Sequence, residues 1–465
     1  MRVGLDFGTS NSSAAVYAAG KVTPLPIERL GPNPAVLRTL LYIPREASPH
    51  ETSGGAVLVG QEAIETYARQ NTGRPVRYAL KLIRVIEMTF AEVGTIQAPG
   101  YALIDENEPG RFFQSLKTFL RDRVYKGTSV FGKVYSLEDL VAAILREIRL
   151  RVEDCLGEPV DGWTVGRPVH FSDDPVGDQI AQRRLEEACR RAGLEDVRFE
   201  LEPIAAGRYY ALGVDRAETA LVFDFGGGTL DLTVLKLGGA ATRWKVLAVG
   251  GVPVAGDVFD SRIVEGSLLE HFGLGAAILP EGRPFPVHIP NALTDWPSIV
   301  ALNKPETLET IREGRRRSDH RPQIAALECL VTRNHGLAMY EEVRRAKARL
   351  SRAERDWIAM NVEEIHFAQE ITRGDFESHI APERKRIEAA VDRVVAAAGL
   401  EPGQIDVVLR TGGSSSIPWF VGMLERKVGR TADGRSKVVE RDLFTSVASG
   451  LALAAAGQGG LDLAG

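Results

Sequence analysis

The same short pattern occurs twice in this chain, as LDFGTSNSSAAV beginning at Leu5 and as VFDFGGGTLDLTVL beginning at Val222. In each copy an apolar run leads into Asp-Phe-Gly, and small polar residues and a second apolar run follow. Alternating apolar residues on both sides of a glycine-rich turn are typical of a β-hairpin. Asp6 and Asp224 are 218 residues apart, about the size of a domain, so the pattern predicts two lobes of similar architecture.

The two turns also have a chemical meaning. Glycines let backbone N–H groups approach an anion closely, and the neighbouring hydroxyl groups add donors. Asp6 and Asp224, at the mouths of the turns, are suited to a hydrated Mg²⁺, which prefers carboxylates, water and phosphate oxygens. One copy alone is as consistent with a plain turn as with a ligand site. Two matched copies predict a pair of phosphate loops that clamp a nucleoside triphosphate across a cleft.

Composition narrows the class of protein. The 465 residues suit two or three domains, and 44% hydrophobic content is enough for a sizeable core. The net charge of −5 gives no electrostatic case for binding nucleic acid or an anionic membrane. The cysteines Cys155, Cys189 and Cys329 are far apart and indicate reduced thiols. With no signal peptide and no apolar run of membrane-spanning length, we expect a cytoplasmic protein.

Strand and helix patterns alternate along most of the chain, which predicts α/β sheets. The segment IDVVLRTGGSSSIP (405–418) is expected to be a buried strand, a Gly-Gly turn and the start of a helix. Residues 76–126 are expected to be largely helical, and 274–330 are interrupted by Pro and Gly, with a basic run at 312–317 that we interpret as a solvated face. The predicted helices cover 136–156, 177–193, 203–213, 256–273, 337–355, 376–399 and 446–456.

Further motifs follow in order: SLKTFL, VGRPVHF, LEPIAAG, AGDVFD, RRAKARLS and LRTGGSSSIP. With the two hairpins, they resemble the nucleotide-binding portion of the heat-shock protein 70 (DnaK-type) family, within the actin-like ATPase superfamily, and most of all its short YegD-type members. The resemblance implies an α/β fold of two lobes, each with a ribonuclease H-like mixed sheet flanked by helices, and a nucleotide cleft between them.

The resemblance also implies a division of the chain. Lobe I is expected at 1–212 and lobe II at 213–440. A C-terminal helix at 441–457 is expected to pack back on lobe I, followed by a flexible tail at 458–465. The cores are expected at 1–33 with 134–212 and at 213–252 with 381–440, and the outer subdomains at 34–133 and 253–380.

The matching positions carry the family's expected roles. Catalytic roles fall to Lys117, Glu202, Asp224, Thr229 and Asp231. Mg²⁺ would be held, largely through water, by Asp6, Glu202, Asp224 and Asp231. Contacts to ATP or ADP are expected from Asp6, Gly8, Thr9, Ser10, Asn11, Gly226, Gly227, Gly228, Thr229, Gly256, Asp257, Arg344, Lys347, Ser351, Gly412, Gly413, Ser414 and Ser416.

The chemistry agrees with these roles. Transfer of a γ-phosphoryl group needs positioning and charge neutralisation more than covalent work. Lys117 can place a positive charge beside the phosphate, and Asp224 or Asp231 can orient the attacking water.

The chain departs from the family in three places. The base pocket has Ala348 and Ser416 where the family stacks two arginines, and Arg344 where a glutamate is usual. Each lost guanidinium stack is worth roughly 0.5–2 kcal/mol, so weaker or less selective base binding is expected. Pro168 matches the family's switch proline, but the loop SDDPVGD lacks the arginine that relays the nucleotide state. The expected ATPase fold ends near residue 457, so no peptide-binding domain is expected in this chain.

The leading hypothesis is an ATP-binding, slowly hydrolysing switch that acts on a protein partner, such as a client, a co-chaperone or an exchange factor. A small-molecule kinase on the same fold would transfer phosphate to a sugar, and an actin-like protein would form filaments with nucleotide. A nucleotide-binding scaffold would bind ATP without releasing phosphate. No nucleic-acid or membrane partner is expected.

Overall fold

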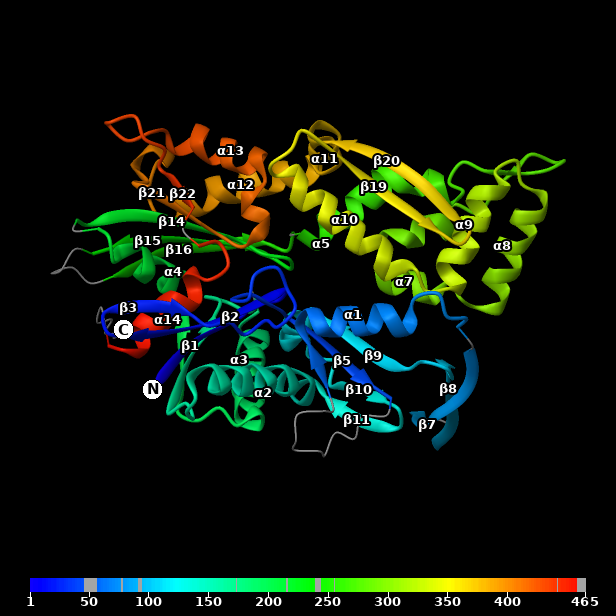
Figure 1. Cartoon of the computed structure of the whole chain (residues 1–465), viewed down its shortest axis with the longest axis horizontal. Helices are drawn as coiled ribbons and strands as arrows, with labels where there is room; N and C mark the ends of the chain where they lie inside the picture. The colour runs from blue at the N-terminus through cyan, green and yellow to red at the C-terminus, as the bar shows by residue number, and fades with distance from the viewer. Residues whose placement is uncertain are drawn as a thin grey trace.

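The computed structural model describes residues 1–45, 57–76, 78–90, 94–172, 174–214, 216–238, 244–254, 256–440 and 442–457, with the backbone alone between 78 and 104. The predicted tail at 458–465 lies outside these residues. Two lobes lie one above the other in Figure 1, each built around one large sheet. None of the described helices is long and apolar enough to cross a membrane.

The first sheet contains the N-terminal hairpin. Its main strands run in the order β13-β12-β1-β2-β3. The hairpin strands β1 and β2 are antiparallel, while β12 is parallel both to β1 and to β13. The strands are β1 (Arg2–Phe7), β2 (Asn11–Ala18), β3 (Lys21–Pro24), β12 (Gly162–Arg167) and β13 (Val197–Leu201), and β4 (Leu37–Arg38) also pairs with β2.

The second sheet repeats this arrangement around the second hairpin. Its order is β22-β21-β14-β15-β16, and in this direction its strand pairings match those of the first sheet position by position: two parallel pairs are followed by two antiparallel pairs. The repeated hairpin pattern therefore predicted a repeated sheet correctly. The strands are β14 (Glu218–Phe225), β15 (Leu230–Leu237), β16 (Lys245–Val252), β21 (Val407–Thr411) and β22 (Val438–Glu440).

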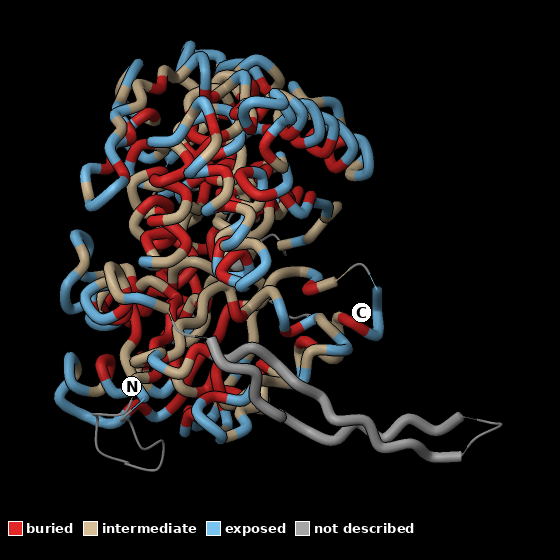
Figure 2. Tube along the Cα trace, turned by 90° about the vertical axis from the view of Figure 1, so that its right-hand side faces the viewer, coloured by how far each residue is buried: buried red, intermediate tan, exposed pale blue. Residues whose placement is uncertain are grey.

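Amphipathic helices cover these sheets and bury their apolar faces in one large core in each lobe. Figure 2 shows the buried residues in the interior of the molecule. In the first lobe the helices are α2 (Leu137–Leu156) and α3 (Pro175–Ala192). The predicted N-cap Ser136 starts α2 with a capping box that it completes with Asp139. In the second lobe, α12 (Ala381–Ala397) and α13 (Pro418–Val428) pack on the sheet.

Two helices join the lobes. Helix α14 (Ser446–Ala455) packs on β1, β2 and β12 and crosses α4 (Glu202–Ala211), which itself contacts β14 and β15. The crossing is close because Gly450 faces the backbone of α4. A Cβ at position 450 would lie 1.7 Å from the carbonyl oxygen of Ala205. Only glycine allows this approach.

We expect Gly450→Ala to destabilise the protein by about 1–3 kcal/mol, because the added methyl group must push α14 away from α4. The matched control is Gly374→Ala in α11 (Arg373–His379), where the new Cβ has, among the described residues beyond its chain neighbours, only Thr372 Oγ1 within 4 Å, at 3.7 Å. Chemical denaturation of both variants measures the difference. Equal stability of the two would contradict a tight crossing.

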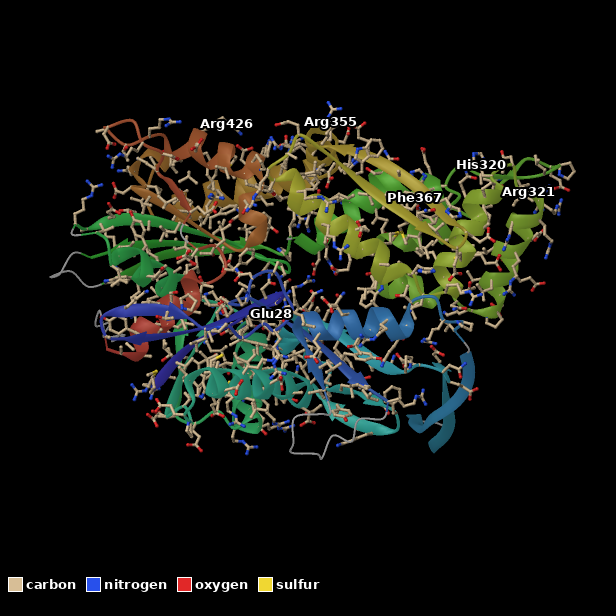
Figure 3. All side chains as sticks on the ribbon, in the orientation of Figure 1. Glu28, His320, Arg321, Arg355, Phe367 and Arg426 are labelled. Carbon is tan, nitrogen blue, oxygen red and sulfur yellow. The ribbon has the colours of Figure 1, made fainter. Side chains whose placement is uncertain are left out.

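The outer part of the first lobe differs from its prediction. Residues 76–126 are not largely helical: β7 (Tyr78–Phe90) and β8 (Gly94–Asp105) form a long antiparallel pair. The three-stranded sheet of this part has the order β6-β5-β9, and helix α1 (Gly60–Asn71) covers it. Glu28 lies beside the start of α1 in Figure 3 and accepts a hydrogen bond from Gln61 N at 2.9 Å. The remaining elements are β5 (Leu40–Pro44), β6 (Leu58–Val59), β9 (Gly110–Gln114), η1 (Leu116–Arg121), β10 (Gly127–Val130) and β11 (Lys133–Ser136).

The outer part of the second lobe is mostly helical. The segment 274–330, irregular in the sequence, contains α6, α7, α8 and most of α9, and the last three carry a proline at their first or second position. Its basic run lies on α8, where Arg312 and Arg315 pair with Glu328 of α9. The elements are α5 (Gly256–Ile263), β17 (Ala277–Ile278), β18 (Arg283–Pro284), α6 (His288–Asn291), α7 (Trp296–Ala301), α8 (Pro305–Arg317), α9 (Arg321–Thr332), α10 (Gly336–Leu350), β19 (Arg355–Val362) and β20 (Ile365–Thr372).

Candidate active site

A cleft of about 1310 Å³ separates the two sheets. Residues from both hairpins, from η1 and from the start of α4 reach it, as do residues of α5, α10 and the turn after β21. Every site residue that the sequence predicted lines this one cleft: Asp6, Gly8, Thr9, Ser10, Asn11, Lys117, Glu202, Asp224, Gly226, Gly227, Gly228, Thr229, Asp231, Gly256, Asp257, Arg344, Lys347, Ser351, Gly412, Gly413, Ser414 and Ser416.

The two hairpin turns face each other across the cleft. A Cβ at Gly227 would lie 1.8 Å from Ser10 Oγ, and a Cβ at Gly228 would lie 3.0 Å from Thr9 Cγ2. The glycines of the second turn are therefore required by the hydroxyl residues of the first. Residues of both turns line the same cleft, and their N–H and hydroxyl groups are the kinds of donor that an anion site needs.

Four carboxyl groups and one ammonium group gather behind the turns. Asp6 comes from β1 and Glu202 from the first turn of α4. Asp224 of β14 is directly opposite Asp231 of β15 in the hairpin register, whereas Asp6 is opposite the neutral Ser13. The Nζ atom of Lys117 lies 2.8 Å from Glu202 Oε1. The two hairpins are thus alike in backbone, but only the second places two acids side by side.

The carboxyl groups repel one another, because Lys117 alone does not neutralise their combined negative charge. Burial raises the pKa of Asp224 to about 7, and repulsion from Glu202 and Asp231 adds to the effect. Burial likewise raises the pKa of Asp231 to about 6, although the Thr229 hydroxyl donates to its Oδ2 at 2.8 Å. The pKa of Asp6 is also well above its ordinary value, through burial and then through Glu202. An added cation would relieve this repulsion.

Lys117 is held as a cation at this point. Burial opposes its charged form, but the carboxylates of Glu202 and Asp6 outweigh burial and raise its pKa. Its side chain is 10% exposed. Lys117 lies in η1, which follows Ser115 in a left-handed conformation with φ of 56°. The local chain therefore directs a permanent positive charge into the acidic end of the cleft.

The other end of the cleft is built around Gly256. Its carbonyl oxygen accepts a hydrogen bond from Lys347 Nζ at 2.7 Å, and the same Nζ lies 2.6 Å from Asp260 Oδ1. Ser414 Oγ donates to the carbonyl oxygen of Gly226 at 2.9 Å. Gly412 precedes Ser414 with φ of 75°, where a Cβ would lie 2.5 Å from the Phe225 carbonyl oxygen. These contacts tie α10 and the 412–416 turn to the second hairpin.

The predicted base pocket lies between α10 and that turn. Ala348 is exposed on α10, and Ser416 ends the turn, so neither supplies a guanidinium group. Arg344 forms ion pairs with two acidic residues. Its Nε atom lies 3.5 Å from Asp260 Oδ2, and its guanidinium group also pairs with Glu341. The sequence indicated that the two stacking arginines of the family are missing. In this arrangement Arg344 does not replace them.

Several cleft residues were missed by sequence reasoning. Thr118, Arg121, Asp260 and Phe444 all line it. Asp260 ends the motif AGDVFD and could have been noticed there. No sequence motif pointed to Phe444. Its ring lies against Gly413, where a Cβ would be 3.2 Å from Phe444 Cζ. It is 37% exposed and offers an aromatic surface beside the predicted base pocket, where Ala348 and Ser416 replace the family's stacking arginines.

Two matched sheets on either side of a polar cleft define the two-lobe fold of the actin-like ATPases. Within that class the chain belongs to the Hsp70 family, because the family model described as Hsp70 protein matches residues 115–277 and 332–462. The chain is 27% identical over 441 residues to "Chaperone protein DnaK" of one strain of Thermus thermophilus, covering 92% of this chain. The protein of the same name from a second strain of that organism matches to the same extent. The chain spans 57% of the length of these two relatives.

Proposed function

We propose that this protein binds Mg-ATP between its lobes and hydrolyses it slowly, as a molecular switch of the Hsp70 type. One observation carries the proposal. The buried Lys117–Glu202 pair and the acids Asp6, Asp224 and Asp231 meet behind two facing turns rich in N–H and hydroxyl donors. This is a cationic and acidic reaction centre beside an anion cradle, as phosphoryl transfer to water requires.

The site fits a divalent cation. Three enclosed carboxyl groups with raised pKa values lack enough positive charge around them, and carboxylate oxygen is the donor that Mg²⁺ prefers. Asp6, Glu202, Asp224 and Asp231 would hold the ion, largely through water. When bound, Mg²⁺ neutralises charge on the β- and γ-phosphate oxygens.

Side chains and backbone groups of the protein carry the remaining steps of hydrolysis. Asp231, fixed by Thr229, or its neighbour Asp224 orients the attacking water and takes its proton. Lys117 stabilises the negative charge that develops on the phosphate oxygens, and Glu202 fixes the position of its ammonium group. The glycine turns supply N–H groups for the remaining phosphate oxygens. The N–H groups of Gly256 and Asp257 donate instead to the carbonyl oxygens of Gly226 and Gly227 and so hold the second turn in place. The products are ADP and inorganic phosphate.

The output of the switch is a change in the relation of the two lobes. Ligand held by turns from both lobes favours a closed arrangement, and its loss permits opening. We propose that this change is read by another protein, a client, a co-chaperone or an exchange factor. Membership of the Hsp70 family supports a partner of this kind.

The first experiment is calorimetric titration with ATP, ADP and GTP in Mg²⁺, together with an assay of phosphate release. Binding of ATP with slow release of phosphate supports the switch. Binding of ATP without release of phosphate would favour the alternative hypothesis, a nucleotide-binding scaffold without turnover, which the altered base pocket motivates. No binding at millimolar nucleotide would contradict both.

The base pocket allows a separate prediction. We expect Ser416→Arg to tighten ATP binding by about 2- to 30-fold, because the new guanidinium group can stack on the base. Ser416→Lys is the matched control, since it adds the charge without the planar group. Calorimetric titration of both variants with ATP and with inorganic triphosphate distinguishes them. A gain that also occurs for triphosphate, or equally for the lysine variant, would contradict stacking.

A further inference from the structure

A second group of chemically active side chains lies outside the cleft. His335, at the start of α10, is buried, with 1% of its surface exposed. Neither of its ring nitrogens has a hydrogen-bond partner among the described residues. A buried imidazole normally has a hydrogen-bond partner for at least one of its nitrogens, since an unpaired polar atom in the interior is destabilising. His335 therefore lacks the partner that its environment calls for.

Two other ligand-type groups face this histidine. Cys329 comes from α9 and is 6% exposed, and Glu363 comes from the two-residue turn between β19 and β20. Glu363 Oε1 lies 3.6 Å from His335 Nε2, and Glu363 Oε2 lies 3.6 Å from Cys329 Sγ. The ligand atoms of all three residues lie within 4.8 Å of one another. The end of α9, the start of α10 and the more distant turn between β19 and β20 thus bring a sulfur, a nitrogen and an oxygen donor close together.

Two of these spacings are close to those of a metal centre: His335 Nε2 to Glu363 Oε1 and Cys329 Sγ to Glu363 Oε2, each 3.6 Å. Because they involve the two different carboxylate oxygens, binding through one oxygen needs a small rotation of the partly exposed Glu363 side chain. Zinc bonds of about 2.3 Å to sulfur and about 2.0–2.2 Å to nitrogen and oxygen give tetrahedral edges of about 3.4–3.6 Å. We propose that Cys329, His335 and Glu363 form a Zn²⁺ site with a water molecule as fourth ligand. The mixed sulfur and nitrogen donors favour Zn²⁺ over Mg²⁺, which requires oxygen.

The surrounding charges permit this binding. Arg333 Nε lies 3.4 Å from Glu363 Oε2, but the Arg333 side chain is 44% exposed and can turn toward solvent. The next residue, Glu364, forms an ion pair with Arg315, with 3.6 Å between Glu364 Oε1 and Arg315 Nη2. The Cys329 thiol loses its proton to solvent when the metal binds, and the resulting thiolate with the Glu363 carboxylate balances the charge of the ion.

The site is placed where the lobes touch. Gly73 N, just beyond α1 of the first lobe, donates to the Arg333 carbonyl oxygen at 2.8 Å, and Asn334 Nδ2 donates to Tyr67 Oη at 3.0 Å. Beside them, the Tyr67 ring of α1 packs edge-on against Trp296 of α7, with ring centres 6.3 Å apart. These helices lie next to each other in Figure 1. A metal ion that fixes the 329–335 segment would therefore stiffen the contact between the lobes.

The test is a titration of the full chain, freed of metal by a chelator, with Co²⁺ and then Zn²⁺. We expect one equivalent of Co²⁺ to give the visible bands of a tetrahedral site and a near-ultraviolet thiolate-to-metal band, both removed by Zn²⁺. Cys329→Ser should abolish the thiolate band. Glu363→Gln, a change at a partly exposed side chain that leaves the core intact, should weaken binding at least 10-fold.

Two matched controls make the test specific. Glu364→Gln alters the neighbouring carboxylate and Cys155→Ser removes the exposed thiol, and neither should change the spectrum. Zn²⁺ should also raise the melting temperature of the wild type and not that of Cys329→Ser. Absence of the tetrahedral spectrum, or a spectrum that survives both Cys329→Ser and Glu363→Gln, would overturn the site.

Discussion

Lys117→Ala is expected to lower the rate of ATP hydrolysis by about 100- to 1,000-fold, the loss that follows removal of one preorganised charge from a reaction centre. The Nζ atom of Lys117 is held at 2.8 Å from Glu202 in a buried position, so its charge needs no reorganisation when negative charge develops on the phosphate. Binding of Mg-ATP should change less, because the phosphate contacts proposed for the glycine turns do not involve Lys117.

Single-turnover phosphate release measures the rate, and calorimetric titration measures binding. Lys236→Ala, at an exposed lysine of β15, is the control for loss of a positive charge and should hydrolyse ATP normally. Glu202→Gln should lose most of the rate as well, since Lys117 then lacks the partner that positions it. Hydrolysis by Lys117→Ala within 10-fold of the wild type would contradict the assigned role.

The hairpins and the topology around them could be read from the sequence because their signals are local. Alternation around Asp6 and Asp224 sets strand, turn and strand within about 14 residues, and no distant contact is needed to define them. The repeat of the motif then implied the repeat of the sheet. The acid cluster followed from the family motifs, which place Lys117 and Glu202 at recognisable positions.

The outer parts of the lobes could not be read in the same way. Apolar residues in 78–105 fit a helix or a strand, and only the pairing of β7 with β8 decides between them. In 274–330 the prolines suggested interruptions, yet Pro297, Pro305 and Pro322 lie in the first turns of α7, α8 and α9. Proline is favoured there, because its missing N–H would be unpaired in any case.

Sites assembled by tertiary structure had no local pattern at all. Cys329 and Glu363 are 34 residues apart, and His335 lies between them without a metal-binding spacing. Phe444 likewise approaches Gly413 only because the chain returns to the cleft after β22. Sequence motifs report what one segment does, whereas these contacts depend on how several segments meet.

Asp224→Asn is expected to stabilise the nucleotide-free protein at pH 8 while it reduces ATP hydrolysis. The pKa of Asp224 is about 7 in the folded protein, raised first by burial and then by Glu202 and Asp231, against an ordinary value of 3.8. The folded state therefore binds this proton more tightly than the unfolded state. Its stability falls as the pH rises from about 4 to about 7, and the full penalty is present above pH 7.

Asparagine carries no charge and avoids that penalty. A difference of about three pKa units corresponds to at most about 4 kcal/mol, and partial exposure to the cleft makes a gain of about 1–3 kcal/mol at pH 8 more reasonable. Near pH 4 the gain should vanish, because Asp224 is then protonated in the folded state. Urea unfolding in the presence of a chelator at both pH values, with the exposed Asp154→Asn as control, measures this.

The direction of this effect separates a reaction centre from ordinary packing. A carboxylate kept for stability would lose stability on replacement at every pH, whereas one kept for cation binding gains it wherever the cation is absent. Mg²⁺ and ATP should therefore stabilise the wild type more than Asp224→Asn, reversing the order found without them. If Asp224→Asn is the less stable protein at pH 8 without Mg²⁺, the crowded acids are not the cation site that the switch requires.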